Sequence, residues 1–188
     1  MYASFGKRFF DILLACFSLI LFGPLMLIIA CLIWIGDRGP AIFKQKRVGQ
    51  NGKEFVVMKF RSMPINTGDI PSADATKVKV TKVGKFIRRT NIDELPQLFN
   101  ILLGDMSIVG FRPALARQEA LFQMREANGA HRALPGLTGL AQINSYDGMP
   151  EEKKAEWDGK YAERITFGKD LSIIARTFLS LLKPPPAY

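Results

Sequence analysis

The chain has 188 residues, enough for one ordinary domain with an appendage, and a formal net charge of +9. This positive excess fits a partner that carries phosphate, such as anionic lipid, a phosphorylated small molecule or nucleic acid. The single histidine, His131, excludes chemistry that needs two histidines, and two cysteines inside an apolar segment do not suggest a secreted disulfide framework.

Residues 1–36 are predicted to form a membrane segment. No charged residue occurs from Ile12 to Ile35, a run long enough for one spanning helix. Gly23-Pro24 divides this run into two arms that are each too short to cross a bilayer. Basic residues flank it on both sides: Lys7, Arg8, Arg38, Lys44, Lys46 and Arg47. Because positive residues prefer the cytoplasmic side, we expect a re-entrant helix, broken at Gly23-Pro24, that returns to the side it entered; a Pro-kinked spanning helix is the alternative.

Residues 37–188 are predicted to form a cytoplasmic catalytic domain at the membrane surface. Two strands, 41–49 and 54–63, surround Gln50-Asn51-Gly52, a strong hairpin signal, and a polar loop follows over 64–77. Helices are expected at 83–89, from Asp93 onward, and at 114–126, 151–164 and 167–183. The last of these has an apolar face that suits either the core or the membrane surface. The fold class is α+β, mostly helical, with a β-hairpin and amphipathic helices.

The most informative stretch runs from Arg88 to Pro113. It places two adjacent carboxylates, Asp93 and Glu94, at the predicted start of a strongly apolar helix, with arginines on both sides in sequence. A helix N-terminus favours anionic groups, and carboxylates held beside arginines stay ionised near neutral pH. This combination suits a carboxylate nucleophile, a metal ligand, or both, acting on a phosphorylated substrate.

Helix capping is the alternative interpretation of the same residues. Asn91 and Glu94 have the spacing of a capping box, with Asn91 as the N-cap. Pro96 would then lie past the first turn, where it removes a helical hydrogen bond. With Asp93 as the N-cap, Pro96 falls within the first turn, where a missing N–H costs little.

Taken together, the motifs resemble those of the bacterial sugar transferases known as monotopic phosphoglycosyl transferases. The resemblance covers essentially the whole chain in one order, and all motifs in register are far more specific than any one alone. The motifs are Lys7-Arg8-Phe9-Phe10-Asp11 before the apolar segment, Phe43–Gly49, Lys59-Phe60-Arg61-Ser62-Met63, Asp93-Glu94-Leu95-Pro96-Gln97-Leu98-Phe99-Asn100, Gly104-Asp105-Met106-Ser107, Arg112-Pro113 and Pro135-Gly136-Leu137-Thr138-Gly139.

The resemblance implies an enzyme at the cytoplasmic face of the bacterial inner membrane. Such an enzyme moves a sugar 1-phosphate from a UDP-sugar to polyprenyl phosphate, typically undecaprenyl phosphate, and releases UMP as the first membrane step of glycoconjugate assembly. By the family pattern, Asp93 attacks the sugar-proximal phosphate and forms a covalent phosphosugar intermediate. Glu94 assists the second step or organises the site, and Mg²⁺ is expected near Asp93.

Further residues are candidates for substrate binding. The physics of phosphoryl transfer requires cations around the phosphates, and the candidates are Lys59, Arg61, Arg88 and Arg112. Pro113 belongs to the same motif as Arg112. Asp170 matches a family carboxylate, and a place at the N-cap or in the first turn of the last helix is the equal alternative.

The sequence departs from the family pattern in two places. Phe111 replaces the usual proline before Arg112-Pro113. Ser145-Tyr146 stands where relatives often have Gly-Arg, so an arginine near the substrate phosphate is absent and Tyr146 becomes a candidate for donor preference.

Two other classes of function compete with this one. A non-catalytic, membrane-anchored adaptor with a basic face explains the charge and the apolar segment, but leaves Asp93-Glu94 with capping alone. Nucleic-acid binding is not expected, because no recognisable domain or interleaved aromatic platform is present. A homodimer is left open.

Overall fold

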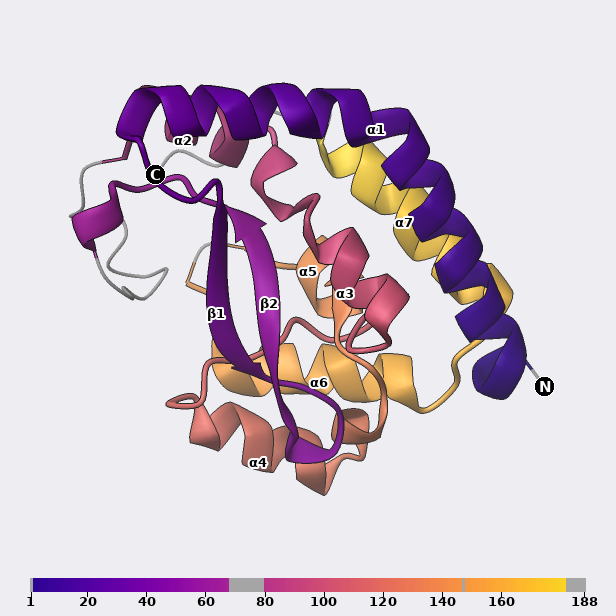
Figure 1. Ribbon diagram of the computed structural model, residues 1–188. Coiled ribbons are helices and arrows are strands. Elements are labelled where there is room, and N and C mark those ends of the chain that lie inside the picture. Colours follow the sequence, from indigo (N-terminus) through magenta and orange to yellow (C-terminus); the bar gives the residue numbers. More distant parts are fainter. Residues whose placement is uncertain (1, 68–79, 147, 182–188) are drawn as a thin grey trace.

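The computed structural model describes residues 2–67, 80–146 and 148–181. Along the chain it has α1 (Lys7–Asp37), β1 (Ile42–Val48), β2 (Glu54–Phe60), α2 (Lys82–Arg89), α3 (Gln97–Leu103), β3 (Ser107–Val109), α4 (Glu119–Ala127), β4 (Gly136–Thr138), α5 (Leu140–Ile143), α6 (Glu151–Ala162) and α7 (Phe167–Leu181). Figure 1 shows α1 arching over α2, α3 and α7, with the β1–β2 hairpin reaching from α1 to α4 at the opposite end. The prediction of a mostly helical α+β fold with a β-hairpin is confirmed.

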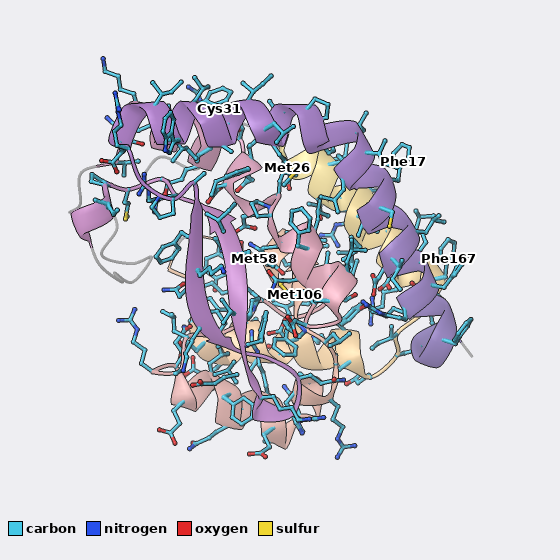
Figure 2. All side chains as sticks on the ribbon, in the orientation of Figure 1. Phe17, Met26, Cys31, Met58, Met106 and Phe167 are labelled. Carbon is cyan, nitrogen blue, oxygen red and sulfur yellow. The ribbon has the colours of Figure 1, made fainter. Side chains whose placement is uncertain are left out.

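The N-terminal apolar segment forms one helix with a bend. α1 continues through Pro24. The prediction that the helix is broken at Gly23-Pro24 is therefore wrong. Proline removes one backbone N–H and crowds the preceding turn, which bends a helix without ending it when the neighbouring turns hold. Figure 2 places Phe17 on one arm of the bent helix and Met26 and Cys31 on the other.

One face of α1 is buried against the rest of the protein and the other is exposed. The buried positions are Lys7, Asp11, Ala15, Met26, Ile29 and Ile33. Exposed large apolar side chains include Phe9, Ile12, Leu13, Phe17, Ile20, Leu21, Leu27, Ile28, Leu32, Trp34 and Ile35. Among the described residues, α1 is the one helix long and apolar enough to cross a membrane.

Polar contacts hold the N-terminal arm of α1 against α3 and α7. Lys7 Nζ lies 2.8 Å from Asp170 Oδ2, and both side chains are buried. Arg8 donates hydrogen bonds to the carbonyl oxygens of Ile101 (2.5 Å) and Leu102 (3.0 Å), which lie at the C-terminal end of α3. A cation at these carbonyls is favourable because they lie at the negative end of the helix dipole.

Apolar contacts hold the C-terminal arm of α1. Met26, Ile29 and Ile33 pack with Phe60 of β2 and Ile87 of α2 in one cluster. At the end of the helix, the Asp37 carboxylate lies 3.3 Å from a guanidinium nitrogen of Arg61. Both arms of α1 are therefore held by the same folded body.

The β1–β2 hairpin has the predicted turn. The strands pair antiparallel with Val48 opposite Glu54 and Ile42 opposite Phe60. Asn51 in the turn has a left-handed φ of 53°, a conformation that asparagine tolerates better than most residues. β2 ends at Phe60, so the predicted strand wrongly included residues 61–63.

A short parallel pair, β3 with β4, was not predicted. Ser107 pairs with Gly136 and Val109 with Thr138. A Cβ on Gly136 would lie 2.0 Å from the Gly110 backbone nitrogen, so only glycine allows the two segments to approach this closely. This pair lies in the main core, which also contains Leu98, Met106, Tyr161 and Ile173.

Candidate active site

Asp93 and Glu94 lie in a 3-10 turn, Ile92–Glu94, that leads into α3. Both capping interpretations of these residues are wrong. Asn91 precedes the turn with a left-handed φ of 54° and makes no side-chain capping bond. α3 begins at Gln97 with Pro96 at its N-cap position, so Asp93 is not the cap either.

Glu94 is the centre of a cluster that joins three segments. Its Oε1 accepts hydrogen bonds from Lys59 Nζ of β2 (2.7 Å) and from Arg112 Nη2, in the segment after β3 (3.1 Å). The Glu94 side chain is 16% exposed and that of Arg112 is 52% exposed. One cation is thus largely enclosed with Glu94, while the other reaches toward solvent, where it can meet a substrate.

The two adjacent carboxyl groups have different pKa values. Burial raises the pKa of Asp93 to about 6, and the negative charge of Glu94 adds to this, while Lys59 and Arg88 oppose it. Burial also acts to raise the pKa of Glu94, but the charges and hydrogen bonds of Arg112 and Lys59 outweigh it and lower that pKa to about 2. Asp93 is therefore the more basic carboxylate, which is the property a nucleophile needs.

Arg88 reaches the same site from the end of α2. Its Nε donates to Ser62 Oγ at 2.8 Å, and its positive charge lowers the pKa of Asp93. The contact depends on a close approach of α2 to the segment after β2, since a Cβ on Gly84 would lie 1.9 Å from the Ser62 carbonyl oxygen. Glycine at this position allows Arg88 to lie beside the carboxylates.

A shallow pocket surrounds the cluster. It is lined by Arg47, Val57, Lys59, Glu94, Gln97, Arg112, Pro113 and Gly136. Pro113 belongs to it and accepts a hydrogen bond from Arg47 Nη1 at 3.3 Å. Arg47 and Gln97 were not predicted as site residues, although both lie within the motifs of the family resemblance.

Two predicted substrate-binding residues, Arg61 and Asp170, have contacts elsewhere. Arg61 pairs with Asp37 at the end of α1. Asp170 is buried and bonded to Lys7 and Tyr161. Both side chains therefore have structural contacts, and the helix-end alternative for Asp170 corresponds to its place in the first turn of α7.

Tyr146 is 60% exposed and follows α5. Its backbone oxygen accepts a hydrogen bond from the Met149 N–H at 3.1 Å. The structure shows no contact between Tyr146 and the Glu94 cluster within the described residues. Its role in donor preference stays a prediction.

Phe111, which replaces the family proline, packs inward. It is 4% exposed, and the Arg125 guanidinium lies 4.7 Å from its ring centre. Arg125 in turn forms a buried ion pair with Asp158 at 2.7 Å. Because successive residues of an extended chain point to opposite sides, the buried Phe111 leaves Arg112 on the side of Glu94.

Comparison with known proteins identifies the class. The family model of the bacterial sugar transferases matches residues 2–184. The chain belongs to this family, which confirms the resemblance inferred from the motifs and the prediction of a transferase.

The chain matches proteins from three bacteria and covers a different share of each. The chain is 42% identical over 186 residues to a Klebsiella pneumoniae protein named UDP-glucose:undecaprenyl-phosphate glucose-1-phosphate transferase, covering 94% of this chain and 39% of that protein. It is 38% identical over 191 residues to a Caulobacter vibrioides protein of the same name, covering 97% of this chain and 72% of that protein. It is 36% identical over 206 residues to a Salmonella typhimurium undecaprenyl-phosphate galactose phosphotransferase, covering 99% and 42%. The chain thus spans about two fifths of the Klebsiella and Salmonella relatives.

Proposed function

We propose that the protein transfers a sugar 1-phosphate from a UDP-sugar to a polyprenyl phosphate, with undecaprenyl phosphate as the acceptor. The observation that carries the proposal is the cluster of Asp93 and Glu94 with Lys59, Arg88 and Arg112. Family membership and the names of the relatives support it. A non-catalytic adaptor would give no reason for two adjacent carboxyl groups with separated pKa values.

In the first step, an Asp93 carboxylate oxygen attacks the phosphorus next to the sugar. The bond from that phosphorus to the bridging oxygen breaks, and UMP leaves with the bond's electron pair. In the second step, an oxygen of the lipid phosphate attacks the same phosphorus, and Asp93 leaves as a free carboxylate. The products are UMP and a polyprenyl diphosphate-linked sugar. The covalent step allows one small site to use a soluble donor and a lipid acceptor in turn.

The cations of the cluster stabilise the phosphate charges. Phosphoryl transfer depends mainly on positioning and on neutralising the phosphate oxygens. Arg112 and Arg88 are the groups placed to do this beside Asp93, while Lys59 holds Glu94 ionised. Glu94, fixed by two cations, orients Arg112 and assists the second step.

The carboxylates of the site fit Mg²⁺ only together with a substrate. Within the described ranges, no group of three or more His, Cys, Asp or Glu side chains could hold a metal ion. Mg²⁺ commonly binds through one or two carboxylates, waters and substrate phosphates, and Asp93 supplies such a carboxylate. When bound, the ion would neutralise charge on the donor diphosphate.

The direct test is product formation. Purified protein in lipid nanodiscs is incubated with undecaprenyl phosphate and, in parallel, with UDP-glucose, UDP-galactose and their N-acetyl derivatives, and UMP is measured. UMP release with at least one donor, dependent on the lipid phosphate, is expected. Absence of UMP with every donor, from protein shown to be folded, would contradict the proposed function and favour the adaptor.

We further infer that α1 enters the membrane and returns to the cytoplasmic face. A helix that crosses once places its ends about 30 Å of hydrocarbon apart. Here Lys7 and Arg8 at one end, and Asp37 at the other, contact the same folded body. The bend of α1 in Figure 1, a helix that contains Pro24, and the exposed apolar face of α1 support this course. UDP-sugars are cytosolic, so the body that binds them is assigned to the cytoplasm.

Thiol labelling tests this topology. Cys16 and Cys31 are replaced, and single cysteines are introduced as Ala3→Cys before α1 and Lys53→Cys in the hairpin turn. A membrane-impermeant maleimide should label neither in intact cells and both after lysis, because both sites are expected on the cytoplasmic side. A periplasmic protein with a free cysteine serves as the control for reagent activity. Labelling of the Ala3→Cys protein in intact cells would indicate a spanning helix.

A further inference from the structure

The side chain of Asn100 joins β2, which carries Lys59, to α3, the helix that follows the Glu94 turn. Asn100 lies in α3 and is 1% exposed. Its Nδ2 donates to the backbone oxygen of Val56 at 2.7 Å, and its Oδ1 accepts the backbone N–H of Met58 at 3.0 Å. Met58, labelled in Figure 2, lies in β2, which contacts α3. A single buried side chain therefore makes two hydrogen bonds to one strand.

The chemistry of these bonds requires an amide. β2 pairs with β1 along one edge, and no other described strand pairs with it. On the opposite edge, the Val56 carbonyl and the Met58 N–H form partly buried hydrogen bonds with Asn100, and backbone groups shielded from water without such a partner are costly. A carboxamide carries a C=O acceptor and an N–H donor next to each other, as a peptide group does. Asn100 thus takes the place of a residue in a neighbouring strand.

Both β2 and α3 lie next to the charge cluster, which consists of Lys59, Glu94 and Arg112. Lys59 follows Met58 in β2, and the Glu94 turn runs into α3 through backbone hydrogen bonds such as that from Leu98 N to Leu95 O (3.0 Å). Lys59 Nζ and Glu94 Oε1 are 2.7 Å apart. One residue along a strand is about 3.3 Å, so a slip of β2 by less than one residue would separate this pair.

We propose that Asn100 is a positioning residue: it fixes the register of β2 against α3 and thereby holds Lys59 on Glu94. Its effect on turnover rests on the proposed function. The connection between Asn100 and β2 is a separate claim with its own measurement.

A double-mutant cycle measures the effect on turnover. Asn100→Ser, Lys59→Met and the double variant are compared by kcat/KM for UMP release. Asn100→Ser shortens the side chain so that it no longer bonds β2. This change should lower kcat/KM about tenfold, since residues that act through one another couple strongly. In the Lys59→Met background the same change should cost less than about twofold. An equal loss in both backgrounds would show that Asn100 is merely structural and overturn the proposal.

Asn128 provides a matched control. Its Nδ2 donates to the backbone oxygen of Ala155 at 2.7 Å, and its Oδ1 accepts the backbone N–H of Ala130 at 3.1 Å. It also bonds one backbone oxygen and one backbone N–H, but at an exposed position at the end of α4, where one bond is local and the other reaches α6. Asn128→Ser should leave kcat/KM within about twofold of the unmodified protein, because none of these partners belongs to the charge cluster.

Hydrogen exchange at the Met58 amide tests the connection without any activity. Asn100→Ser should speed exchange at Met58 at least tenfold, by the loss of its acceptor, while Asn128→Ser should not. Unchanged exchange at Met58 overturns the proposal whatever the activity. If the unmodified protein releases no UMP with any donor but Met58 responds as expected, the proposed function fails and the connection stands.

A second variant covers the case in which Asn100→Ser does not fold. Asn100→Gln keeps both polar groups on a longer side chain, so β2 must shift to accept them. Its loss in kcat/KM should again vanish in the Lys59→Met background. A loss that persists there contradicts the positioning role.

Discussion

Replacing Asp93 by asparagine is expected to lower turnover by roughly a thousandfold or more, because a neutral amide cannot act as the nucleophile. The shape of the side chain is retained, so the fold should persist. The pKa of Asp93, raised to about 6 by burial and by Glu94, makes it the more basic of the two carboxylates. UMP release with a saturating donor and undecaprenyl phosphate gives the rate.

The covalent intermediate can be observed separately. Unmodified protein incubated with donor alone should gain the mass of one phosphosugar in intact-protein mass spectrometry, and Asp93→Asn should not. Glu126→Gln, which removes an exposed carboxylate in the last turn of α4, is the matched control and should behave as the unmodified protein. Full turnover by folded Asp93→Asn protein would exclude Asp93 as the nucleophile.

Removal of divalent metal is expected to stop UMP release, and added Mg²⁺ or Mn²⁺ should restore it. The described residues contain no three-carboxylate group, so the site supplies too few ligands to hold the ion alone. Calorimetry should therefore show weak Mg²⁺ binding to the free protein and tighter binding when a UDP-sugar is present. Asp93→Asn should weaken Mg²⁺ binding in the presence of the UDP-sugar. Undiminished turnover after exhaustive chelation, verified by metal analysis, would contradict this prediction.

The sequence predicted those parts of the fold that local chemistry determines. Asn51-Gly52 marked the hairpin turn, and the predicted start of α2 differs from the observed one by one residue. The β3–β4 pair was missed because strands of three residues have no readable alternation and their parallel partners are distant in sequence. The start of α3 was misplaced because a 3-10 turn separates Glu94 from the helix.

The candidate site could be predicted only in part. Lys59, Glu94 and Arg112 are far apart along the chain, and the family motifs, rather than local spacing, brought them together as candidates. Arg61 was a candidate because of its charge and Asp170 because it matches a family carboxylate, but neither criterion reveals the residue that the side chain contacts. Their partners, Asp37 and Lys7, lie in or at the end of the apolar helix, which was treated as a separate segment. The different pKa values of Asp93 and Glu94 depend on burial that no local pattern encodes.

The ion pair between Lys7 and Asp170 also sets an order of events during synthesis. The two residues are separated by 163 positions, so the ribosome needs about 10–30 s to make Asp170 after Lys7 has been added. During that interval the N-terminal helix can meet the bilayer before its polar partner exists. If α1 enters the membrane as we propose, it can do so before α7 docks, because Asp170 is made after Lys7.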